Sequence, residues 1–314
     1  NIDIQVIEKI YEMTNGQPGL VSWFGELLTE KYNKEPEQII DIDLWKEVYA
    51  AARDIEHNNT VQNIIAKAKD NHYKHYVLDL FQDSDIPFSF DENWCNYMYI
   101  HGLISYKKVR EFGAIYHVCQ FSSPFIQSRL FQAFSKAMRN IRDKNTQALE
   151  PLDLLEDVFT EPTINIPLLL ERYKAYLKRL KDHGTNPWAN QPRRKSDYHL
   201  TESVGHFHLF HWLQMALGKR CAISPEFPTG NGKVDLHLCC NDTQKGLIEV
   251  KSFINAYEVK KAISQAANYA REKNYHDITV AMFVPFTDEH VLNQISVSKK
   301  VDYINVNVVA IGQG

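Results

Sequence analysis

The C-terminal third of this 314-residue sequence predicts an α/β domain built on a mixed sheet. Residues 234–240 alternate apolar and polar side chains, as a half-buried strand does. After a run of turn residues, a second strand is expected at 247–253 and a later one at 278–284. Helical apolar spacing at 198–217 and 256–273 flanks these strands. The predicted order is helix, three strands, helix and strand.

Two carboxylates and one ammonium converge in this prediction. Side chains repeat their face every two residues along a strand, so Glu249 and Lys251 share a face. If the two strands pair as a hairpin, Asp235 lies beside Glu249. Two adjacent carboxylates repel each other unless a cation lies between them. Mg²⁺ and Mn²⁺ prefer such oxygen ligands. The pattern favours metal-assisted phosphodiester hydrolysis, with Lys251 holding water or a phosphoryl oxygen. The alternative is an ordinary hairpin with a charged, solvated face.

Further polar residues lie on neighbouring elements. Glu202 follows Thr201, a candidate N-cap, in the first turn of the preceding helix. Gln265 and Tyr269 are four residues apart and therefore share a face of the second helix. Glu226 comes nine residues before Asp235 on the preceding strand. It is either a further metal ligand or a cap of the following turn, and we favour the ligand.

The order of elements resembles the PD-(D/E)XK nuclease superfamily over about residues 196–290, and most closely the branch found at the C-terminus of AAA-type ATPase-like proteins. The residues that carry the resemblance are Glu202, Gly232-Lys-Val-Asp235, Glu249-Val-Lys251 and Gln265-x-x-x-Tyr269. The resemblance implies that Asp235 and Glu249 bind the metal and that Lys251 is the catalytic lysine. It further makes Glu202 an accessory acid and Gln265 a helper. The usual proline of the first motif is absent before Asp235, and some members of the superfamily bind without cutting.

The first 59 residues predict helices broken by a turn at 14–19. The stretch Gly16-Gln-Pro-Gly-Leu20 resembles the Gly-x-Pro-x-Leu turn in the lid of AAA-like ATPases. The sequence contains no Gly-x-x-x-x-Gly-Lys-Ser/Thr phosphate loop, so we do not expect this chain to bind or hydrolyse ATP by itself. The chain begins with Asn1 rather than Met. We therefore expect a piece of a longer protein, and the resemblance to an ATPase lid, with no phosphate loop in this chain, implies an ATPase core N-terminal to Asn1 in the parent protein.

Residues 60–140 predict a winged helix, with three helical stretches, a hairpin and a helix from Pro124. The third helical stretch, 91–101, has Asp91 as its expected N-cap and contains no lysine or arginine. The segment holds nine Lys and Arg against seven Asp and Glu, a net of only +2. This charge favours protein contacts or a hinge over DNA reading.

Residues 141–195 predict a connector, with an amphipathic helix at 167–180 and a loop at 183–192. The basic run Arg193-Arg194-Lys195 is either simply solvated or touches phosphate at the edge of the nuclease cleft. The expected organisation is a lid-like segment, a winged helix, a connector and a nuclease-like domain, over residues 1–59, 60–140, 141–195 and 196–314.

The composition of the sequence argues against several other classes of protein. The net charge is −4, which does not support a protein that coats nucleic acid non-specifically. No apolar run is long enough to span a membrane. The five cysteines include no Cys-x-x-Cys pair, and their odd number predicts reduced thiols in the cytoplasm, with the adjacent Cys239 and Cys240 filling a strand.

Histidines are frequent in the helix of 198–217. We expect His208 and His211 on a partly solvated helix face, whereas His206 is one turn from Glu202 and can face the same cleft.

The sequence thus predicts a Mg²⁺- or Mn²⁺-dependent nuclease whose partner is nucleic acid, with DNA as the expected substrate. The competing hypothesis is a regulatory tail of a signalling ATPase that binds protein or nucleic acid without cutting. In both cases protein contacts through the winged helix are expected, and no membrane is involved.

Overall fold

The computed structural model describes residues 1–34, 39–81, 85–111, 113–137, 147–151, 153–160, 163–194, 197–218, 220–226, 235–241, 244–253 and 255–313. It divides into two compact units. The first takes in residues 1–133, and the second takes in 134–228 and 234–314. The finer division into four segments remains a prediction.

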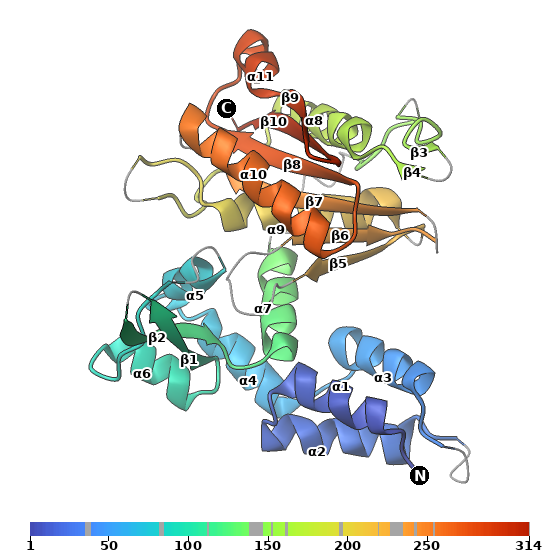
Figure 1. Ribbon diagram of the computed structural model, residues 1–314, viewed down its shortest axis with the longest axis vertical. Coiled ribbons are helices and arrows are strands. Elements are labelled where there is room, and N and C mark those ends of the chain that lie inside the picture. The colour runs from blue at the N-terminus through green and yellow to red at the C-terminus, as the bar shows by residue number, and fades with distance from the viewer. Residues whose placement is uncertain are drawn as a thin grey trace. The chain divides into compact units, whose positions relative to one another are not determined.

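The first unit is mainly helical and carries one β-hairpin (Figure 1). Its elements are α1 (Ile4–Thr14), α2 (Pro18–Glu26), a π-helical turn (Leu27–Lys31), α3 (Ile42–Asp54), α4 (Asn59–Ala68), α5 (Lys74–Leu80), α6 (Asn93–Ile100), β1 (Ile104–Glu111), β2 (Ala114–Phe121) and most of α7 (Pro124–Ala137), whose last four residues are assigned to the second unit. Polar caps set several helix starts, since Asp3, Asp41 and Asn58 accept backbone N–H groups in the first turns of α1, α3 and α4.

An aromatic cluster forms the core beneath α2 and α3. The ring of Phe24 is fully buried and lies 5.1 Å from Trp45 and 5.2 Å from Phe125. Further along, Asp91 lies in the turn before α6, where its backbone N–H donates to Ser89 Oγ, and it is not the N-cap of that helix. The helix therefore starts later, with Glu92 at the N-cap position and no side-chain cap bond.

The second unit is built on a mixed sheet in the order β5-β6-β7-β8-β10-β9. Its elements are β3 (Phe159–Thr160), β4 (Thr163–Ile164), α8 (Ile166–Asp182), α9 (Glu202–Leu217), β5 (Ala222–Glu226), β6 (Asp235–Cys239), β7 (Lys245–Ser252), α10 (Ala256–Glu272), β8 (Asp277–Val284), α11 (Glu289–Ile295), β9 (Val297–Val301) and β10 (Ile304–Gly312). Neighbouring strands from β5 to β7 are antiparallel, whereas β7, β8 and β10 run parallel. The mixed α/β class is as the sequence predicts.

Helices cover both faces of this sheet. Figure 1 shows α10 across one face and α8 and α9 on the other. The helix α10 makes the crossover that a parallel pair requires, and its Ala262, Ala266 and Ala267 pack against Val280 and Val306. On the other face α9 approaches very closely, because Gly205 carries no side chain where a Cβ would lie 2.6 Å from the Phe283 ring.

The helix α9 is buried almost all round, so the expected solvated face of His208 and His211 is wrong. Aromatic side chains cover it from α8 and the loop that follows. The hydroxyl of Tyr173 lies 2.6 Å from Nδ1 of His208, and the Trp188 ring centre is 4.8 Å from that imidazole. A helix enclosed between a sheet and a second helix loses the polar face that an isolated amphipathic helix would have.

The prediction that all cysteines are reduced is also wrong. Cys221 and Cys240 form a disulfide with their Cα atoms 3.9 Å apart. The β5–β6 ladder pairs Ala222 with Cys239, so the next position outward places Cys221 opposite Cys240. A separation of 19 residues gives no local signature of such a bond. Cys95, Cys119 and Cys239 are free.

Within the described ranges, no helix is long and apolar enough to cross a membrane.

Candidate active site

The strand β7 brings Glu249 and Lys251 to one face of the sheet. Nζ of Lys251 lies 3.1 Å from Oε1 of Glu249, and the two side chains are only 13% and 4% exposed, respectively. Leu247, two residues earlier on the same strand, belongs to the apolar core under α10. The charged pair therefore lies on the face of the sheet that α10 covers, nearer the carboxyl end of β7 than Leu247.

A third charge reaches this pair from the start of α9. Oε1 of Glu202 lies 3.5 Å from Nζ of Lys251, so two carboxylates from different elements converge on one ammonium. Glu202 and Lys251 are 49 residues apart in the sequence, yet all three side chains are at least partly buried. The predicted grouping of Glu202, Glu249 and Lys251 is present.

Side-chain hydrogen bonds to backbone carbonyls fix the loop that leads to Glu202. Ser252 Oγ donates to the carbonyl of Leu200 at 2.8 Å, which ties the residues before α9 to the end of β7. Arg194 Nη2 donates to the carbonyl of Phe253 at 2.7 Å and lies 2.8 Å from an Asp197 oxygen. These contacts hold the loop, and α9 starts at Glu202 with Thr201 at the N-cap position, as predicted, although Thr201 makes no side-chain cap bond.

The basic run before α9 thus has a structural role that the sequence did not indicate. Arg194 is committed to Asp197 and to the end of β7, and Arg193 Nη1 donates to the carbonyl of Tyr198 at 3.0 Å. Lys195 lies outside the described residues. Nothing in the local sequence could have indicated this role, because the acceptor carbonyl of Phe253 is 59 residues away.

One oxygen of Glu249 is buried without a hydrogen bond. Among the described residues, none donates to Oε2 of Glu249, although the side chain is almost wholly enclosed. A buried carboxylate oxygen normally has a partner. Its lone pairs are available to a proton or a cation, and hard divalent cations favour such an oxygen. This oxygen is therefore a suitable ligand for a hard cation such as Mg²⁺ or Mn²⁺.

The backbone register brings two further predicted ligands to the same row of the sheet. Asp235 pairs with Glu249 across β6 and β7, and Glu226 pairs with Asp235 across β5 and β6. Directly paired residues have Cβ atoms about 5 Å apart. The side chains of Glu226 and Asp235 lie outside the described set, as does the turn between them. Among described side chains, no three His, Cys, Asp or Glu form a metal-ligand group.

Two further residues of interest lie on the helices α10 and α9. Gln265 is half-buried on α10, adjacent to the buried Ala266 that packs on the sheet. His206 is buried one turn after Glu202 on α9, and burial, with a smaller contribution from the charge of Lys251, lowers its pKa to about 3. His206 is therefore neutral near pH 7, and it adds no second positive charge beside Lys251.

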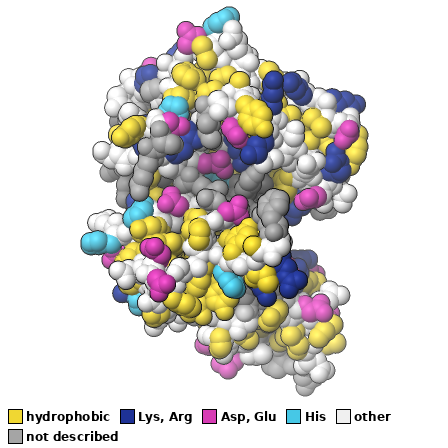
Figure 2. All heavy atoms as spheres, turned by 60° about the vertical axis from the view of Figure 1, so that its left-hand side comes forward, with side chains coloured by type: hydrophobic (Ala, Val, Ile, Leu, Met, Phe, Trp, Pro, Cys, Tyr) yellow, Lys and Arg dark blue, Asp and Glu magenta, His cyan; other side chains and the backbone are white. Residues whose placement is uncertain are grey.

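Charges on the molecular surface are mixed. On the face shown in Figure 2, Lys and Arg side chains are interspersed with Asp and Glu side chains and with apolar ones. This distribution agrees with the net charge of −4.

A family model described as "Domain of unknown function (DUF8371)" matches residues 193–287 of the chain. The matched segment runs from the Arg193–Arg194 contacts through α9, β5, β6, β7 and α10 to the end of β8. Searches of curated proteins and of solved structures found no match.

Proposed function

We propose that the second unit is a metal-dependent nuclease that hydrolyses phosphodiester bonds of DNA. The observation that carries the proposal is the buried Glu249, whose Oε1 pairs with Lys251 while Oε2 has no donor among the described residues. Glu249 and Asp235 would hold Mg²⁺ or Mn²⁺, with Glu226 at the next position of the row. When bound, the metal would lower the pKa of a coordinated water and offset charge on a phosphate.

Lys251 would act on the reacting groups directly. Its ammonium has three N–H donors, and the carboxylates of Glu249 and Glu202 fix its position. A donor held in place before reaction stabilises charge that develops on a phosphoryl oxygen without reorganisation. Glu202 would orient Lys251 or a water, and Gln265 would support the site from α10.

The order of elements supports a fold of the PD-(D/E)XK kind. The helix α9, the antiparallel strands β5, β6 and β7, the crossover helix α10 and the parallel strand β8 follow the predicted order. The family match covers this same set of elements. In the first unit, α1 to α3 would be the lid-like segment, and α4 to α7 with the hairpin would be the winged helix, which contacts protein.

Cleavage of a panel of nucleic acids tests the proposal. The parent protein and Lys251→Ala are incubated with plasmid, linear duplex, single-stranded DNA and RNA, with Mn²⁺ or with a chelator. Lys245→Ala is the matched control, because Lys245 is an exposed lysine on the same strand. We expect metal-dependent cleavage of DNA by the parent and the control, reduced at least ~100-fold in Lys251→Ala. Equal cleavage by Lys251→Ala would contradict the assigned role of Lys251, and preferential cleavage of RNA would contradict the assigned substrate.

The competing function is a regulatory module of a signalling ATPase that binds without cutting. The negative net charge and the mixed surface of Figure 2 favour it. Calorimetric titration with Mn²⁺ separates the two functions, because it needs no catalysis. The nuclease proposal expects metal binding by the parent protein that is lost in Asp235→Ala and in Glu249→Gln. A protein that neither binds Mn²⁺ nor cuts would be the binding module.

A further inference from the structure

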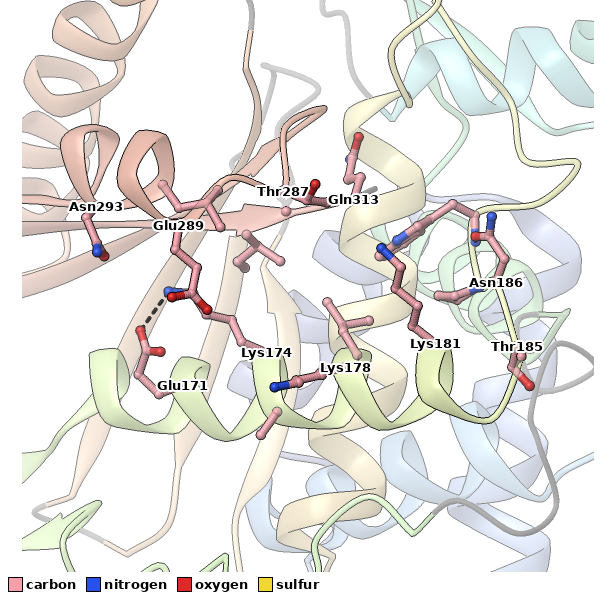
Figure 3. A pocket seen from close by; sticks show the side chains of 18 residues that line it. Glu171, Lys174, Lys178, Lys181, Thr185, Asn186, Thr287, Glu289, Asn293 and Gln313 are labelled. Atoms are coloured by element: carbon pink, nitrogen blue, oxygen red, sulfur yellow. Dashed lines mark hydrogen bonds and ion pairs between the residues drawn. The ribbon is translucent and has the colours of Figure 1, made fainter.

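A cavity lies in the same unit, at the carboxyl ends of β8 and β10. It has a volume of about 730 Å³ and lies between α8 and the segment of residues 287–293 (Figure 3). Sites for small molecules commonly have volumes of this order, and they often lie beyond the carboxyl ends of parallel strands.

This cavity is distinct from the Glu249 site. It is lined by α8, which covers the sheet face where the Phe283 ring lies 6.3 Å from Tyr173. Glu249 and Lys251 lie on the opposite face, with Leu247 and the core under α10. A ligand in the cavity would therefore not occupy the candidate active site.

Lysines form one wall of the cavity. Lys174, Lys178 and Lys181 are spaced by four and three residues, so they lie on one side of α8, as Figure 3 shows. Lys174 pairs with Glu171 at 2.8 Å. Lys178 and Lys181 have no acidic group within ion-pair distance among the described residues, and Glu289 is the other acidic residue in the lining. Two ammonium groups are thus left for an anion.

A buried glutamine is among the residues that line the same cavity. Gln313 is only 8% exposed, and its backbone N–H donates to the carbonyl of Val284 at 2.9 Å. Its side-chain Nε2 has no hydrogen-bond acceptor among the described residues, although it is enclosed. Figure 3 shows this side chain among the residues that line the cavity. A buried donor without an acceptor is unfavourable, and an acceptor on a bound ligand would satisfy it.

The other residues that line the cavity indicate the chemistry of the uncharged part of the ligand. The amides of Asn186 and Asn293 offer both donors and acceptors, while Leu177, Leu292 and Ile311 supply apolar surface. A fitting ligand combines one anionic group with a body that has apolar surface and hydrogen-bonding edges. A nucleoside has such a body, since its base carries both donors and acceptors.

We propose that this cavity binds a nucleoside monophosphate. A phosphomonoester carries about −1.5 to −2 charges at pH 7, which matches two lysines without acidic partners. Lys178 and Lys181 would bind the phosphate, and Gln313 would donate to the base or sugar. A triphosphate would exceed the available positive charge. The proposal requires no phosphate loop and is independent of the proposed nuclease activity.

Calorimetric titration of the full chain with AMP, GMP, CMP and UMP tests this site. Lys178→Gln/Lys181→Gln removes the two phosphate-binding charges, and both residues are exposed on α8. The matched control is Lys299→Gln/Lys300→Gln, which removes two exposed charges from β9 in the same unit. We expect at least one monophosphate to bind the parent and the control alike, and the α8 variant at least about tenfold more weakly. Absence of binding by all four nucleotides, or equal weakening in both variants, would overturn the proposal.

Two further titrations test the role of Gln313 and the source of the bound phosphate. Gln313→Met removes the buried donor without adding a charge, so we expect weaker binding and an unchanged midpoint of thermal unfolding; unchanged affinity in the folded variant would contradict the role of Gln313. A short 5′-phosphorylated oligodeoxynucleotide distinguishes the source of the ligand. Binding as tight as that of the monophosphate assigns the cavity to a strand end, whereas much weaker binding assigns it to a free nucleotide, and in both cases the phosphate contact is the same.

Discussion

Nζ of Lys251 lies 3.1 Å from Oε1 of Glu249, two positions earlier on β7, and both side chains are nearly enclosed. Removing two charges from water is unfavourable, and their attraction offsets this cost only in good geometry. Glu202, at 3.5 Å, supplies a second carboxylate to the same ammonium. The burial of each of these three charges is therefore stabilised by the other members of the group.

Breaking this pair should destabilise the second unit. Lys251→Met leaves Glu249 buried without its cation, and we expect a loss of about 3 kcal/mol in the free energy of unfolding. The double variant Lys251→Met/Glu249→Gln should be less destabilised than the sum of the two single variants, because the uncompensated charge is absent. Urea unfolding of the four proteins measures this coupling. Additive effects would mean that the pair contributes no coupling energy.

Acidification should weaken the fold through the histidines of α9. Burial, with a smaller contribution from His211, lowers the pKa of His208 to about 3, and the pKa of His206 is also about 3. The unfolded chain binds these protons near pH 6.5, so stability is complete above that pH and falls as the pH drops toward 3. Each histidine contributes a slope of up to about 1.4 kcal/mol per pH unit. His208→Gln retains a partner for Tyr173 but does not titrate.

Urea unfolding at pH 7 and at pH 5.5 measures this slope. The variant His208→Gln should lose less stability between the two pH values than the parent protein does. Equal losses would show that His208 does not contribute to the acid sensitivity.

The close approach of α9 to the sheet should not tolerate a methyl group. In Gly205→Ala the new Cβ would lie 2.6 Å from Phe283, and we expect a destabilisation of about 1–3 kcal/mol. Phe283→Leu in the same chain should recover part of this loss by making room. The matched control is Gly25→Ala on α2, where no atom lies within 4 Å and the better helix propensity of alanine should be neutral or stabilising. Thermal unfolding compares the variants; a neutral Gly205→Ala would mean that α9 can shift.

The disulfide predicts a definite count of reactive thiols. Alkylation of the denatured protein without reductant should modify Cys95, Cys119 and Cys239 alone, and prior reduction should expose all five cysteines. Mass spectrometry gives this count directly. Cys221→Ser/Cys240→Ser should lower the free energy of unfolding by about 3 kcal/mol, because the closed loop spans 19 residues. Alkylation of five cysteines without reductant would instead support reduced thiols.

Local patterns were sufficient to predict most elements of the second unit. The alternation before Cys239 and the apolar run after Lys245 correspond to β6 and β7, and the helical spacing after Asn255 corresponds to α10. Glu249 and Lys251 could be assigned to one face because the two-residue period of a strand does not depend on its surroundings. The edge strand β9 was not predicted, since its Ser298, Lys299 and Lys300 have no apolar alternation.

The sequence by itself determined the α/β class, the order of helices and strands around β7, and the pairing of Asp235 with Glu249, because these depend on short periodicities and on one hairpin. Only the tertiary structure decided that Glu202 reaches Lys251, that Arg194 holds the end of β7, that α9 is enclosed and that Cys221 meets Cys240. Each of these contacts joins residues 19 or more positions apart, and their proximity depends on how the helices pack on the sheet. No local spacing records that packing, because it is a property of the assembled core.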